Sequence, residues 1–148
     1  MIYVIGVGHT IQHDSLHFFG ETHEYIAKLR QLVHDNNIQL IAEEYSNEAA
    51  RMDQVTDSVT KIVADELGVP HRYCDPDSAE RRSIGCHSSD DDHLRLGNWF
   101  DKIYDKAREQ VIFVCGDSHK TDFASLIAGN GFEVMIVENS FITKVDRT

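Results

Sequence analysis

The stretch Val111-Ile112-Phe113-Val114-Cys115, followed by Gly116-Asp117-Ser118-His119, decides how this chain folds. Its apolar part does not alternate with polar residues, which is typical of a strand buried on both faces of a parallel sheet. The same order opens the chain, where Ile2-Tyr3-Val4-Ile5 precedes Gly6-Val7-Gly8-His9. Both segments therefore predict a buried strand that ends in a glycine turn and a histidine.

Other apolar runs and helical patterns alternate along the rest of the chain. Further strands are predicted at Ile38 to Ala42, at the weak run His71 to Cys74, and at Phe132 to Val137. Apolar repeats at three- and four-residue steps predict helices over residues 25–33, 52–67, 96–107 and 123–127. We expect residues 52–67 to form one helix, with Ser46 or Asn47 as its N-cap and Gly68 at its end.

This alternation predicts a single α/β domain over residues 1–148. We expect three layers, in which a mainly parallel five-stranded sheet is flanked by helices, with right-handed crossovers and the first strand in the centre. The polar stretch from Asp75 to Asp92 interrupts the pattern. We therefore expect an irregular, mobile insertion there, over the carboxyl edge of the sheet.

The composition is that of an ordinary globule, with 41% hydrophobic and 26% charged residues. The formal net charge of −11 disfavours nucleic acid and anionic membranes as partners. The three cysteines form no C-x-x-C pair, and no signal peptide or membrane span is evident, so we expect a cytoplasmic protein. We expect a small-molecule substrate as its partner, and the sequence leaves a homo-oligomer open.

The residues that follow the apolar runs are the expected site, because ligands of open α/β sheets bind beyond the carboxyl ends of the strands. These residues include His9, the pair Glu43 and Glu44, and the late residues Asp117 and His119. Two histidines and a carboxylate can hold a catalytic divalent metal with open positions. We expect Mn²⁺ or Zn²⁺ on His9, His119 and either Glu43 or Glu44. The remaining glutamate or Asp117 would then act as the general base.

Some choices stay open at this stage. Strand alternation lets only one of Glu43 and Glu44 point easily into the cleft. Arg81 and Arg82 form a basic pair that can hold an anionic part of a substrate or cofactor, or can pair with Asp75, Asp77 or the aspartates of residues 90–92.

Further histidines follow the first glycine turn. His13 and His17 have the spacing of zinc ligands on a helix, but we expect them to belong to an amphipathic loop cover. The role of His87 is not determined.

The two Gly-x-x-His motifs with a glutamate between them resemble the TraB/Tiki group and its erythromycin esterase and ChaN-like relatives. The matching segments are Gly6-Val7-Gly8-His9, Glu43-Glu44 and Gly116-Asp117-Ser118-His119. The resemblance implies a mixed α/β fold with a site at one sheet edge. It also implies metal-dependent hydrolysis in some members and haem-associated iron binding in others. By this resemblance His9 and His119 are metal ligands or acid–base residues, and Arg81 or Arg82 is the arginine that those families carry.

Our first functional hypothesis is a small metal-dependent hydrolase that acts on an ester, amide or phosphate. The alternative is a module that binds a nucleotide, another small anion, a metal or haem without turnover, with backbone amides of residues 116–118 as an anion nest. A metallophosphoesterase-like protein is a third hypothesis, suggested by Gly116-Asp117 alone.

Overall fold

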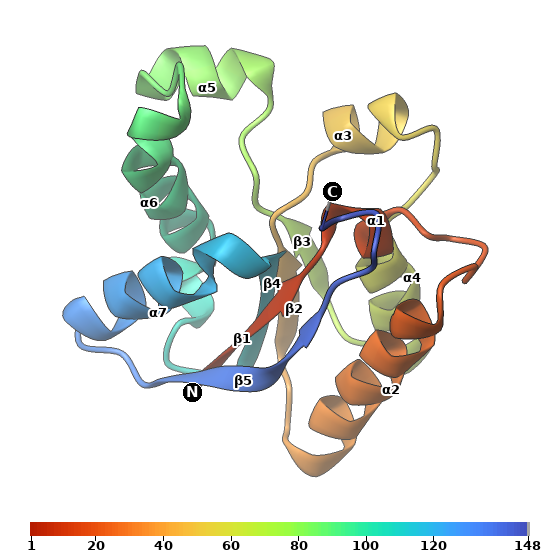
Figure 1. Ribbon diagram of the computed structural model, residues 1–148. Helices are drawn as coiled ribbons and strands as arrows, with labels where there is room; N and C mark the ends of the chain where they lie inside the picture. Colours follow the sequence, from red (N-terminus) through yellow and green to blue (C-terminus); the bar gives the residue numbers. More distant parts are fainter. Residues whose placement is uncertain (148) are drawn as a thin grey trace.

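Five parallel strands form one sheet with the order β3-β2-β4-β1-β5 (Figure 1). The computed structural model describes residues 1–147. The strands are β1 (Ile2–Val7), β2 (Leu40–Glu43), β3 (His71–Tyr73), β4 (Val111–Gly116) and β5 (Val134–Phe141). The α-helices are α1 (His9–Gln12), α2 (Gly20–Asp35), α3 (Asn47–Met52), α4 (Val59–Leu67), α5 (Ser78–Ile84), α6 (Asp92–Ile103) and α7 (Lys120–Gly129). Short 3₁₀ turns are η1 (Ser89–Asp91), η2 (Tyr104–Lys106) and η3 (Asp117–His119).

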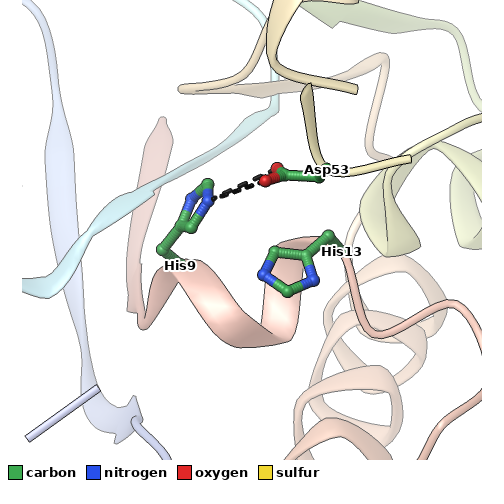
Figure 2. Close-up of side chains that lie close together, drawn as sticks. All are labelled: His9, His13 and Asp53. Carbon is green, nitrogen blue, oxygen red and sulfur yellow. Dashed lines mark hydrogen bonds and ion pairs between the residues drawn. The ribbon is translucent and has the colours of Figure 1, made fainter. Parts of the chain in front are cut away.

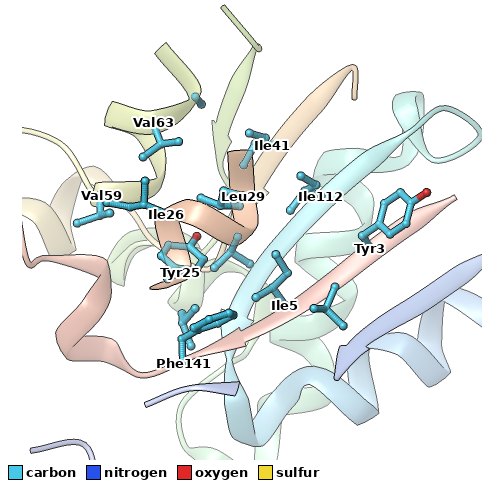
Figure 3. Packing of buried hydrophobic residues seen from close by; sticks show 14 of the residues in the cluster. Tyr3, Ile5, Tyr25, Ile26, Leu29, Ile41, Val59, Val63, Ile112 and Phe141 are labelled. Atoms are coloured by element: carbon cyan, nitrogen blue, oxygen red, sulfur yellow. The ribbon is translucent and has the colours of Figure 1, made fainter. Parts of the chain in front are cut away.

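Two hydrophobic cores cover the two faces of the sheet, which confirms the three-layer α/β prediction. In β1 and β4 all the apolar side chains are buried, and alternate residues of each strand feed opposite cores. One core joins the sheet to α2 and α4, whose Tyr25, Leu29 and Val63 lie on it (Figure 3). The other core contains Trp99 of α6 and Phe123 of α7. Burial on both sides explains why these strands are continuously apolar.

The connections between strands place a crevice at the carboxyl edge of the sheet. Those after β1 and β2 lead to the layer of α2 and α4, whereas those after β3 and β4 lead to the layer of α6 and α7. In the order β3-β2-β4-β1, neighbouring strands therefore send their chains to opposite faces. Ligands of open α/β sheets bind where such connections diverge. In Figure 1 the short helices α1, α3 and α5 gather beyond this edge.

Two expectations about strands and insertions need correction. The sheet is parallel throughout, and β4 rather than β1 holds the central position, although neither strand is at an edge. The stretch from Asp75 to Asp92 is not irregular, because it contains α5 and η1. Asp77 caps α5 by accepting a hydrogen bond from the amide of Glu80, and Gly85 ends it in the left-handed conformation.

The predicted helix over residues 52–67 is also wrong, because the chain forms two helices there. Ser46 caps α3 and Gly68 ends α4, as expected, but the helix is broken between them. Gln54 takes a positive φ of 58°, and Ser58 starts α4 by accepting a hydrogen bond from the amide of Lys61. This break puts Asp53 at the carboxyl-terminal end of α3, on the side of the sheet edge where the site is predicted.

Among residues 1–147, no helix combines the length and the apolar character needed to cross a bilayer.

Candidate active site

A cavity of about 290 Å³ lies beyond the carboxyl ends of four strands. Its lining comes from the segments that follow β1, β2, β3 and β4, and consists of His9, Gln12, Glu44, Tyr45, Ala49, Asp75, Arg81, Arg95, Gly116, Ser118 and His119. The parallel sheet thus brings His9, Glu44 and His119 to one cavity. This is the convergence that the strand-end residues predict.

One side of the cavity is a network of paired charges, which we call the arginine side and define as Glu44, Asp75, Arg81, Arg95 and His119. Asp75 Oδ1 accepts hydrogen bonds from Arg95 Nε at 2.7 Å and from Trp99 Nε1 at 3.0 Å. Its other oxygen accepts one from Arg81 Nη2 at 2.8 Å. Arg95 also pairs with Glu44. Both arginines are therefore held by carboxylates rather than free in the cavity.

The side chain of Glu44 is nearly buried, like those of Asp75 and Arg95, and each of its carboxylate oxygens has a protein partner. Oε1 accepts a hydrogen bond from the amide of Gly116 at 2.8 Å, and Oε2 pairs with Arg95. His119 Nε2 lies 3.9 Å from Oε2. Burial raises the pKa of Glu44, although Arg95 and the Gly116 amide act in the opposite direction. A carboxylate beside a cavity-facing imidazole can orient that imidazole.

The opposite side holds a different group, which we call the histidine side and define as His9, His13, Tyr45 and Asp53. His9 Nε2 lies 3.3 Å from Asp53 Oδ2, and the rings of His9 and His13 are 5.0 Å apart (Figure 2). Tyr45 donates a hydrogen bond of 2.5 Å to Asp53 Oδ2. Burial and the Asp53 carboxylate raise the pKa of Tyr45, so its hydroxyl stays protonated as the donor. His9 and Tyr45 line the cavity, and His13 and Asp53 adjoin them.

The glycines before His9 are explained by what approaches them. A Cβ at Gly6 would overlap Asp117, and one at Gly8 would overlap the carboxylate of Asp146. That carboxylate accepts hydrogen bonds from the amide of Thr10 at 3.0 Å and from its hydroxyl at 2.6 Å. Asp146 thereby fixes the start of α1, the helix that carries His9.

The structure places Glu43 outside the cavity. Its side chain is fully buried, accepts hydrogen bonds from the hydroxyl of Ser58, and pairs with His71 Nε2 at 2.8 Å. Ser58 is the N-cap of α4 and His71 begins β3. Of the two neighbouring glutamates, Glu44 therefore faces the cavity, whereas Glu43 ties α4 and β3 to the end of β2.

Two other predicted site residues also lie apart from Glu44. Asp117 accepts a hydrogen bond from Ser140 and pairs with Lys120, each at 2.7 Å. Although burial acts to raise it, these two partners hold the pKa of Asp117 below its ordinary value. It faces a neighbouring depression of about 410 Å³, which shares His9 with the first cavity. Arg82 is exposed on α5 and does not line the cavity, unlike Arg81.

Sequence reasoning missed Arg95, Asp53 and Tyr45, and assigned His13 to a loop cover. Arg95 belongs to the polar face of a helix, where nothing in the sequence distinguishes it from a solvated residue. The spacing of His9 and His13 was a usable signal, because residues four apart on a helix share one face. Asp53 could be found only from the helix break that follows it.

A scan against protein families, a search of curated proteins and a search of solved structures found no match to this chain.

Proposed function

We propose that this protein is a small metal-dependent hydrolase whose active site is the cavity at the carboxyl edge of the sheet. One observation carries the proposal. The imidazole of His9 lines the same cavity of about 290 Å³ as Glu44 and His119, whose side chains approach each other at 3.9 Å. A volume near the low end of ligand pockets fits a small molecule, or one end of a larger one.

The two sides of the cavity supply complementary chemistry. A divalent ion held on the side of His9 would lower the pKa of a bound water to roughly 7, which would make hydroxide available at neutral pH. His119 would take up or deliver the proton, because its ring lines the cavity and Glu44 lies 3.9 Å from its Nε2. Asp117 is less suited to this role, since Lys120 and Ser140 already occupy it.

The pairing of the arginines favours an uncharged ester or amide over a phosphate as substrate. The guanidinium of Arg95 is shared between Glu44 and Asp75, and Arg81 also pairs with Asp75. The charge of each guanidinium is already matched by a carboxylate, and the chain carries a formal net charge of −11. The arginines therefore serve to hold Glu44 and Asp75 in place.

The same observations weigh against an anion-binding module. An anion nest at residues 116–118 needs free backbone donors, but the amide of Gly116 donates to Glu44. The resemblance of the Gly-x-x-His segments to the TraB/Tiki and erythromycin esterase/ChaN-like groups agrees with hydrolysis, and family membership is part of this proposal.

The test is hydrolysis of small chromogenic esters, amides and phosphate esters by tag-free protein. The protein is first treated with chelator and then resupplied with Zn²⁺ or Mn²⁺. We expect turnover of an ester or amide that requires the ion and is lost in His119→Ala. His34→Ala, a change on the exposed surface of α2, is the control. Turnover that persists without metal, or that is the same in His119→Ala, would contradict the proposal.

A further inference from the structure

His9, His13 and Asp53 come together from two separate segments of the chain. Each offers one ligand atom, and these atoms all lie within 4.8 Å of one another. The two histidines stand four residues apart, at the start of α1 and just after its end, so they share one face. Asp53 follows α3 and reaches toward them from the opposite side (Figure 2).

We infer that His9, His13 and Asp53 form a zinc site at the edge of the cavity, in place of the set His9, His119 and Glu43 or Glu44. This zinc site specifies the metal of the proposed function. Its role in hydrolysis rests on that proposal, whereas the binding of zinc does not. Around one zinc ion, ligand nitrogens and oxygens lie about 2.0–2.2 Å from the metal, hence roughly 3–4 Å from each other. The side chains need only a small contraction to reach this spacing, and His9 is free to move because its side chain is 62% exposed.

In the part of the chain that the structure describes, the ring nitrogens of His9 and His13 have no hydrogen-bond partner outside this group. Within residues 1–147, the side chain of His13 has no hydrogen bond, although it is partly buried, and its contact is the ring of His9. His9 pairs with Asp53 alone. Buried polar groups are usually hydrogen-bonded, and an ion between the partly buried ring of His13, the ring of His9 and the Asp53 carboxylate would supply the missing partner.

The carboxylate is held in the way that metal ligands commonly are. Tyr45 donates to Asp53 Oδ2, and the neighbour of Oδ1 is His9 Nε2 at 3.4 Å, itself one of the proposed ligands. Tyr45 is itself buried, with 2% of its surface exposed, so this donor is fixed. Outer hydrogen bonds of this kind orient metal-ligating side chains.

The backbone on both sides of the group is constrained as well. Asp146 anchors Thr10 at the start of α1. Asp53 is followed by Gln54 with a positive φ, a conformation that costs non-glycine residues free energy. The amide of Val55 closes this turn on the carbonyl of Ala50 at 3.0 Å. The ligands are thus presented by two short helices whose ends are fixed.

The donor set selects the ion. Two imidazoles and one carboxylate, with a position left open toward a cavity, are the ligands of catalytic zinc sites. Mn²⁺ prefers a larger share of oxygen ligands. We therefore expect Zn²⁺ to bind at one ion per chain, and more tightly than Mn²⁺.

The test is titration of tag-free, metal-free protein with Zn²⁺ in competition with a chromophoric chelator. Tyr45→Phe removes a hydrogen bond to a ligand and should weaken Zn²⁺ affinity roughly 10–100-fold. His13→Ala and Asp53→Asn each change a ligand itself and should weaken the affinity by at least as much. His119→Ala should leave the affinity unchanged. His34→Ala is the matched control, because His34 and Asp35 form an exposed pair at 3.1 Å without a third ligand. Circular dichroism of each variant excludes loss of the fold.

The outcomes separate this site from the proposed function. Stoichiometric Zn²⁺ binding that depends on His13 and Asp53 supports the site, even if no hydrolysis is found. Absence of stoichiometric binding overturns it. Binding that is lost in His119→Ala but kept in His13→Ala also overturns it, and would move the ion to the arginine side.

Discussion

The two sides of the cavity differ in how completely their polar groups are satisfied. On the arginine side, Glu44, Asp75, Arg81 and Arg95 each have a charged partner within the network. On the histidine side, the side chain of His13 has a ring contact but, within the part of the chain that the structure describes, no hydrogen bond. Leaving a buried charge without its partner costs a large amount of folding free energy. Partly exposed imidazoles can instead be hydrated until a ligand binds. The comparison suggests that one side is assembled by folding and the other by binding.

The largest effect is expected from breaking the arginine side. Arg95→Met leaves Glu44 and Asp75 without their shared cation, although both carboxylates are nearly buried. Removing one partner of a buried pair costs about 3–5 kcal/mol, so the free energy of unfolding in urea should fall by that amount.

The control for this change is Arg30→Met, which breaks an ion pair with Glu66 whose side chains are both more than half exposed. Such surface pairs contribute about 0–1 kcal/mol. If the two variants lose similar stability, the arginine side is not a network that folding must complete.

The histidine side should respond to metal instead. Without metal, His13→Ala should change the free energy of unfolding by only about 0.5 kcal/mol, as is usual for surface positions. With free Zn²⁺ at 100 times its dissociation constant, the wild type should gain about 2.7 kcal/mol, and the variant, with a site at least roughly 10-fold weaker, should gain no more than about 1.4 kcal/mol. Urea unfolding with and without Zn²⁺ measures both numbers. A large metal-free loss in His13→Ala would mean that this side, too, is assembled by folding.

Glu43 and Glu44 sharpen the comparison, because neighbouring glutamates serve different parts of the molecule. Glu43→Gln disturbs hydrogen bonds to Ser58 and His71 at a fully buried position. We expect a loss of about 1–3 kcal/mol in unfolding free energy, with Zn²⁺ affinity and any turnover unchanged. Glu44→Gln should reduce turnover. If turnover is instead lost in Glu43→Gln and kept in Glu44→Gln, Glu43 is the functional carboxylate.

The layered fold could be predicted from the sequence because the signals for it are local and strong. Continuous apolar runs mark β1 and β4, and the glycine that follows each marks the sheet edge. The same reasoning placed His9, Glu44 and His119 at one edge, since parallel strands leave their ends little freedom.

The remaining parts depend on tertiary contacts or on weaker signals. The choice between Glu43 and Glu44 is made by Ser58 and His71, which approach β2 only after α4 and β3 have packed. The break after α3 was hidden because Met52 and Val55 fit an apolar stripe, yet Met52 is 78% exposed. The local signals for α5, a capping Asp77 and the terminating Gly85, were present in the sequence and were not used.

The smallest expected effect concerns the turn that presents Asp53. Gln54 occupies the left-handed position after α3, where glycine is usual, and its φ is 58°. A left-handed conformation costs a non-glycine residue roughly 1–2 kcal/mol, and glycine loses about 0.5–1 kcal/mol through its greater freedom when unfolded. Gln54→Gly should therefore raise the free energy of unfolding by up to about 1 kcal/mol. Since the turn keeps its shape, Zn²⁺ affinity should stay the same. Gln54→Val is the matched opposite change, because a β-branched residue tolerates positive φ poorly, and it should lower both quantities. A stabilised Gln54→Gly with much weaker Zn²⁺ binding would show that the strain itself, rather than the position of Asp53, is what the ion requires.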